Sequence, residues 1–95
     1  MNEELMSYYR ARLADNLPTF RAKLKMTQEE LAERLNISRH TVIGIESKNR
    51  VMPWTTFLAM IFLFERFEET KLLLHVLKIY PVEYEDALTS DFKAI

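Results

Sequence analysis

Side chains that commonly perform catalysis or hold metal ions are few in this sequence and lie far apart along it. The chain has no cysteine and two histidines, His40 and His75, which do not form a short metal-binding motif. No Gly-rich loop could hold a phosphate, and no nucleophile elbow surrounds any of the serines, which are Ser7, Ser38, Ser47 and Ser90. The sequence therefore predicts no catalytic site, no metal site and no cofactor, and it argues against an enzyme.

The charged residues point instead to the middle of the chain. The formal net charge is −1, but residues 17–54 carry an excess of three positive charges and residues 55–95 an excess of three negative charges. An excess of this size is common on protein surfaces, so it favours a polyanion partner only in combination with other features.

Two features bear on the compartment of the protein. The N-terminal residues include early acids and no apolar core of a signal peptide. The longest apolar run, residues 57–64 (FLAMIFLF), is much shorter than the roughly 20 residues that a membrane-spanning helix needs. We therefore expect a cytoplasmic protein with no membrane partner, which the absence of cysteine also suits.

The spacing of apolar residues predicts an all-α fold, because they recur at intervals of three and four and because Gly and Pro are rare. A first helix is expected over residues 3–14, although one longer helix kinked at Pro18 is an alternative, since the apolar stripe continues beyond it. Further helices are expected over residues 55–64, with Leu58 on the inner face, and over residues 68–80. The tail that follows is expected to contain one weak turn and to fray.

The stretch TQEELAERLNISRHTVIGIE, residues 27–46, predicts two short helices joined by a tight turn. Thr27 is a suitable N-cap, and Glu30 three residues later completes a capping box. Asn36 can adopt the left-handed conformation that ends a helix, and Ser38 can cap the next helix over residues 38–47. Helices joined by so short a turn cannot pack antiparallel, so they should cross steeply.

The run LPTFRAKLKMTQEELAERLNISRHTVIGIESKNRVMP, residues 17–53, resembles the phage-repressor and Cro-type (XRE-like) helix-turn-helix family. TQEELAERL resembles the first motif helix, NIS the turn and RHTVIGIE the recognition helix. The resemblance implies a compact five-helix lambda-repressor-like domain over residues 17–64. Residues 1–16 would add an N-terminal helix, and residues 65–95 a C-terminal dimerisation helix and a tail.

The family pattern also implies an ion pair, and this chain departs from the pattern in its turns. Members often pair an Arg in the preceding helix with the acid that ends the recognition helix, which here would be Arg21 and Glu46. Asn36 and Lys48 stand where the family usually has Gly. Lys48 leaves the local backbone open, although Asn49 could supply a left-handed residue.

The resemblance implies double-stranded DNA as the partner, with the recognition helix in the major groove. The expected base-contacting residues are Arg39, His40, Ile43 and Gly44. Arg39 suits guanine and Ile43 a thymine methyl group, while contact of Arg39 with phosphate alone is the alternative. The expected phosphate-contacting residues are Thr27, Gln28, Thr41, Lys48, Asn49 and Arg50. Gly44 suggests a close approach of DNA or of another helix, and Trp54 could lie on the DNA backbone or on the core.

The C-terminal helices are apolar over most of their circumference, which predicts a homodimer. The expected interface residues are Phe62, Leu63, Phe67, Leu72, Leu73, Val76, Ile79 and Tyr80. His75 in this region could make dimerisation depend on pH, or could be a buried neutral side chain.

Two functional hypotheses follow. The first is a nucleoid-associated, sequence-specific transcriptional regulator, more specifically a homodimeric repressor of a near-palindromic operator. The alternative is an antitoxin that binds a toxin protein, through residues 1–16 or 81–95, and represses its own operon.

Overall fold

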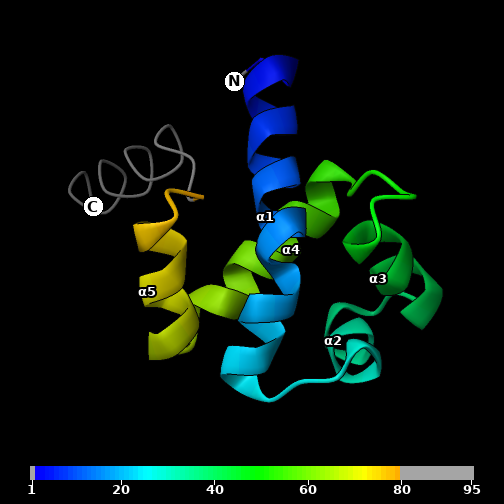
Figure 1. Ribbon diagram of the computed structural model, residues 1–95, viewed down its shortest axis with the longest axis vertical. Helices are drawn as coiled ribbons and strands as arrows, with labels where there is room; N and C mark the ends of the chain where they lie inside the picture. Colours follow the sequence, from blue (N-terminus) through cyan, green and yellow to red (C-terminus); the bar gives the residue numbers. More distant parts are fainter. Residues whose placement is uncertain (1, 80–95) are drawn as a thin grey trace, which may run out of the picture.

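The computed structural model describes residues 2–79, and this part of the chain is helical with no strand. Its helices are α1 (Glu3–Leu24), α2 (Gln28–Leu35), α3 (Arg39–Glu46), α4 (Trp54–Glu65) and α5 (Glu68–Val76). In Figure 1, α1 runs along the long axis, α2 and α3 lie on one side of it, α5 lies on the other, and α4 crosses behind. The predicted all-α fold is confirmed.

Helix α1 is continuous through Pro18, so the first helix does not end at the expected residue 14 but is one longer helix. Asn2 caps its start, with Oδ1 accepting from the N–H of Leu5 at 2.8 Å. One stripe of α1 is buried, comprising Tyr9, Leu13, Leu17 and Phe20. Pro18 itself is exposed. Packing of this stripe outweighs the hydrogen bond that Pro18 cannot donate.

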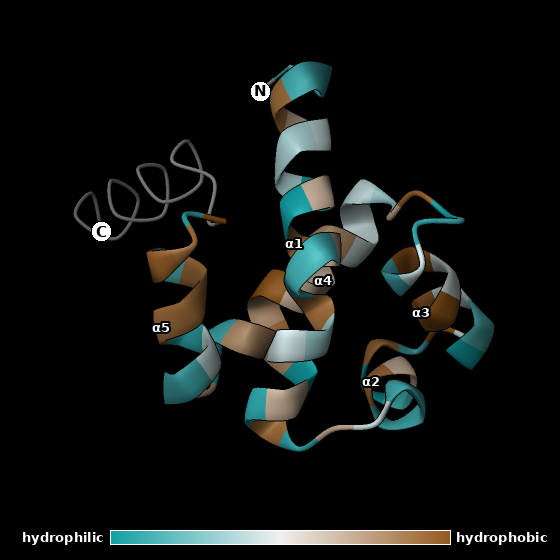
Figure 2. Ribbon diagram, viewed as in Figure 1, coloured by the Kyte–Doolittle hydropathy of each residue, from teal (hydrophilic) through white to brown (hydrophobic). Residues whose placement is uncertain are grey.

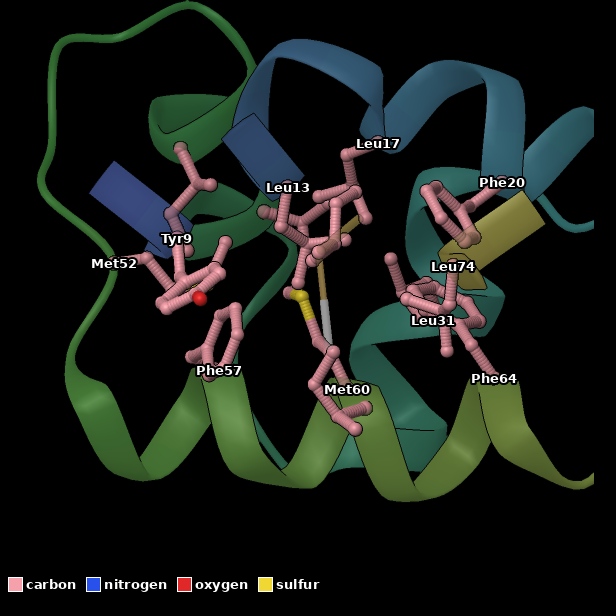
Figure 3. Packing of buried hydrophobic residues seen from close by; sticks show 14 of the residues in the cluster. Tyr9, Leu13, Leu17, Phe20, Leu31, Met52, Phe57, Met60, Phe64 and Leu74 are labelled. Carbon is pink, nitrogen blue, oxygen red and sulfur yellow. The ribbon is translucent and has the colours of Figure 1, made fainter. Parts of the chain in front are cut away.

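The core lies between α1 and α4, and the rings of Phe20 and Phe64 stack there with centroids 4.7 Å apart (Figure 3). The buried face of α4 consists of Phe57, Met60, Ile61 and Phe64. Leu58, expected on this face, is instead exposed. Because α4 is apolar on nearly all sides, its sequence pattern does not indicate which side packs inward, and the expectation for Leu58 failed for this reason.

Trp54 packs against the core, which decides between its two expected positions. Its ring stacks on Phe57 with centroids 4.6 Å apart and is partly buried. This stack holds the first turn of α4 against the core.

Helix α5 ends at Val76, earlier than the expected residue 80, because Lys78 adopts a left-handed conformation (φ 54°). Arg12 Nε donates to the carbonyl of Leu77, which ties α1 to the end of α5. The buried Thr70 hydroxyl donates to the Phe64 carbonyl at 2.6 Å and closes the turn between α4 and α5. The turn expected in the tail lies outside the described residues. None of the described helices is long and apolar enough to cross a membrane.

Candidate nucleic-acid interface

The first turn of α2 is held by a complete capping box. Thr27 Oγ1 accepts from the N–H of Glu30 at 3.0 Å, and Glu30 Oε1 accepts from the N–H of Thr27 at 2.9 Å. Hydrogen bonds from the backbone and then the side chain of Thr27 lower the pKa of the Glu30 carboxyl. The box therefore fixes where α2 begins.

The turn between α2 and α3 follows the predicted pattern. Asn36 has a left-handed conformation (φ 57°), and Ser38 Oγ accepts from the N–H of Thr41 at 3.1 Å to cap α3. Val42 and Ile45 of α3 are fully buried against the core, close to the nearly buried Ala32 of α2. The opposite side of α3 is thereby left facing outward.

A largely buried ion pair joins α1 to the end of α3. Arg21 Nε lies 2.7 Å from Glu46 Oε2 and Arg21 Nη2 lies 3.0 Å from Glu46 Oε1, so the pair is bidentate. The two side chains are only 18% and 8% exposed, and the hydrogen bond to Glu46 raises the pKa of Arg21. Arg21 Nη1 also donates to the carbonyl of Met26.

The same carboxylate holds the first residue of α2. Gln28 Nε2 donates to Glu46 Oε1 at 3.0 Å. Glu46 therefore connects the start of α2, the end of α3 and the C-terminal part of α1 by directional polar contacts. This contact of Gln28 was not expected from the sequence, because nothing local couples residue 28 to residue 46.

The first turns of α2 and α3 border one polar hollow. It measures about 500 Å³ and is lined by Arg21, Thr27, Gln28, Glu29 and Arg39. Arg39 and His40 are exposed at the start of α3, whereas Ile43 and Gly44 are half-buried further along it. The structure thus brings Arg39 together with Thr27 and Gln28, which were expected to contact DNA.

Gly44 is approached by the loop that follows α3, not by another helix. A Cβ built on Gly44 would lie 3.2 Å from Arg50 Cβ. The N–H groups of Asn49 and Arg50 both donate to the Gly44 carbonyl, at 2.9 and 3.1 Å. Lys48 provides the left-handed residue that this return requires (φ 66°), so the expectation that Asn49 would provide it is wrong.

Two of the expected phosphate ligands have protein partners in this loop. Lys48 Nζ pairs with Asp15 of α1, and both side chains are exposed. Arg50 Nη1 donates to Thr41 Oγ1 at 2.9 Å. The spacing of Ser38 and Thr41 allows the sequence to predict that their side chains meet. The contact of Arg50 with Thr41 could not be predicted in this way, because it depends on the course of the loop between them.

The expected dimerisation residues divide by burial. Phe62, Leu72 and Val76 are 67%, 66% and 65% exposed. Leu63, Phe67 and Leu73 are half-buried. Ile79 is fully buried in the core, so it is not available at a surface and is removed from the expected interface residues. Tyr80 lies outside the described residues.

His75 lies on α5 facing α4. Its Nε2 is 3.6 Å from Glu65 Oε1, and its side chain is nearly half exposed. The expectation that His75 is buried is therefore wrong.

Comparison with protein families gives one match. A family model described as helix-turn-helix matches residues 19–53, a little over a third of the chain. This range begins within α1 and contains all of α2 and α3. No curated protein and no solved structure is detectably similar to the chain.

Proposed function

We propose that this protein, whose residues 19–53 form a helix-turn-helix of the XRE type, is a homodimeric repressor that binds a near-palindromic operator. The match of these residues to a helix-turn-helix family supports a DNA-binding transcriptional regulator. The observation that carries the proposal is the orientation of α3. Val42 and Ile45 are fully buried while Arg39 and His40 are exposed at its N-terminal end.

In the proposed complex α3 lies in the major groove, with its N-terminal residues at the base edges. Arg39 donates to guanine O6 and N7 through two N–H groups, which is worth about 1 to 3 kcal/mol of discrimination. His40 donates to or accepts from a neighbouring base. Ile43 contacts a thymine methyl group at the edge of the same surface.

Backbone contacts would position α3 without specifying sequence. The start of α2 supports such a contact, because Thr27 and Gln28 line the same hollow as Arg39 and a helix N-terminus favours an anion. On the other side of α3, the loop residues Lys48, Asn49 and Arg50 are the proposed ligands. Affinity should therefore fall clearly as salt concentration rises.

A second copy of the chain is the proposed partner of the exposed apolar side chains of α4 and α5. Phe62, Leu72 and Val76 are each about two thirds exposed, which leaves apolar surface that a dimer would bury. Two-fold symmetry would place two α3 helices on half-sites about one DNA turn apart. A dimer bound across a promoter would repress by occupying the DNA that RNA polymerase needs.

Selection from a random pool of duplex DNA tests the proposal. Wild-type protein should enrich a near-palindromic sequence, and Arg39→Ala should lose or relax one position in each half-site. Arg34→Ala is the matched control, since Arg34 is an exposed arginine near the C-terminal end of α2. This variant should enrich the same sequence as the wild type. Absence of enrichment by the wild type would contradict the proposal and favour the alternative in which a toxin protein is the main partner.

Sedimentation equilibrium tests the dimer separately. Phe62→Glu should convert a dimer into a monomer, because it places charge in the apolar contact. Tyr8→Glu changes another exposed aromatic residue, on α1, and should leave the dimer intact. A wild-type monomer at the concentrations that bind the selected DNA would contradict the homodimer.

A further inference from the structure

A chain of hydrogen bonds holds the Arg50 side chain against α3. Arg50 Nη1 donates to Thr41 Oγ1 at 2.9 Å, and the Thr41 and Ser38 hydroxyls lie 2.8 Å apart. Ser38 also caps α3 by accepting from the N–H of Thr41. The Arg50 guanidinium is therefore held at the first turn of α3, although Arg50 itself lies in the loop that follows this helix.

Gly44 provides the space through which this side chain passes. A Cβ at Gly44 would lie 3.2, 3.6 and 3.8 Å from Cβ, Nε and Cδ of Arg50. The first distance is tighter than most contacts of a Cβ atom, so an alanine at this position would require Arg50 to shift by a few tenths of an ångström. Gly is also unfavourable in a helix interior, and its presence here is explained by the passage of Arg50.

The position of the Arg50 guanidinium is unfavourable for a purely structural cation. A cation that stabilises a helix interacts with the carbonyl groups at its C-terminal end, but Arg50 extends back to Thr41 near the N-terminal end. The first turn of α3 contains no acidic residue that would offset its charge. An anion outside the protein is the partner that this arrangement favours.

We propose that Arg50 is a pre-positioned ligand of a DNA phosphate, and that Thr41 and Gly44 are positioning residues that act through it instead of contacting DNA themselves. The proposal rests on the proposed function and deepens it. Arginine has five N–H donors, and the contact with Thr41 uses one, so enough donors are left for a bidentate contact with phosphate. Holding the side chain in place before binding reduces the entropy lost when the complex forms.

A double-mutant cycle on the selected operator tests the proposal, with affinity measured over a range of salt concentrations. Arg50→Ala should weaken binding about tenfold and reduce the salt slope by about 1, as expected for one lost phosphate contact. Thr41→Val should weaken binding severalfold in the wild-type background and have no effect in the Arg50→Ala background. Thr41→Ser, which keeps the hydroxyl that accepts from Arg50, should bind with wild-type affinity.

Gly44→Ala provides an independent test that does not depend on loss of folding. Alanine is the better helix former, so the thermal midpoint should stay equal or rise, while operator affinity falls severalfold through displacement of Arg50. This loss should also disappear in the Arg50→Ala background.

Effects of Thr41→Val and Gly44→Ala that are the same with and without Arg50 would overturn the positioning role and indicate direct contacts with DNA. Unchanged affinity in Arg50→Ala would overturn Arg50 as a ligand. In both cases specific binding by the wild type would remain, so the proposed function would stand. Failure of the wild type to bind any selected sequence would overturn both.

Discussion

The α2–α3 pair and the α4–α5 pair are held in different ways. Both α2 and α3 begin with a side chain that accepts a backbone hydrogen bond, whereas α4 and α5 begin without one. The α2–α3 pair is also tied to α1 through Arg21, Glu46 and Gln28. Figure 2 shows hydrophobic colour over much of α4, while α2, α3 and α5 each carry hydrophilic residues alongside their apolar ones.

This difference suits two kinds of recognition. Directional polar bonds fix the angle at which a helix is presented, which contact with base edges requires. Apolar contacts contribute binding free energy without fixing geometry as closely, which suffices for association of two copies. The α2–α3 pair should therefore be sensitive to loss of single hydrogen-bonding groups, and the α4–α5 pair to loss of apolar volume.

The largest predicted effect is on the apolar side of the comparison. Phe64→Ala should reduce the free energy of unfolding by about 4 kcal/mol, because it removes a fully buried ring that stacks on Phe20. Phe62→Ala, on the same helix but mostly exposed, should cost less than about 1 kcal/mol. Urea unfolding at low protein concentration measures both, and equal losses would contradict the assigned face of α4.

The next effect compares two ion pairs of different burial. Arg21→Ala should cost about 3 kcal/mol, since it leaves the largely buried Glu46 carboxylate with only part of its hydrogen bonds. Lys48→Ala removes an exposed pair with Asp15 and should cost less than about 1 kcal/mol. Similar losses in urea unfolding would show that burial does not distinguish the two pairs.

A smaller effect should follow loss of the N-cap of α2. Thr27→Ala removes the hydroxyl that accepts from the N–H of Glu30 and should cost about 1 kcal/mol. Thr27→Ser retains the oxygen and should be close to wild type. A thermal midpoint that does not change in Thr27→Ala would indicate that packing alone fixes the start of α2.

The smallest effect is a pH dependence from the same capping box. The pKa of Glu30 is lower in the folded protein, so its contribution to stability is present above the unfolded pKa and lost as pH falls toward the folded value. The wild type should therefore lose more stability than Glu30→Gln between about pH 6 and pH 3. Glu33→Gln, on the same helix outside the box, should follow the wild type, and identical curves for all three would contradict this contribution.

Local patterns in the sequence predict the α2–α3 pair well. The capping box, the left-handed Asn36 and the cap at Ser38 are all present as expected, because each depends on residues within a few positions. The Arg21–Glu46 pair was expected from the family pattern, which local residues alone do not provide.

The errors concern contacts that tertiary packing decides. Continuity of α1 through Pro18 depends on burial of a stripe that runs from Tyr9 to Phe20, on both sides of the proline. The inner face of α4 and the burial of Ile79 are set by neighbouring helices. The proximity of Arg50 to Gly44 depends on the return of the loop at Lys48, which no local signal predicts.

The most direct test of sequence recognition by α3 is the ratio of affinities for the selected operator and for a scrambled duplex, measured for wild type and Arg39→Lys. Lysine keeps the charge but lacks the paired N–H groups that match guanine. If Arg39 contacts bases, the ratio should fall about tenfold or more while affinity for the scrambled duplex stays the same. An unchanged ratio would contradict base recognition by Arg39 and reduce its role to a phosphate contact.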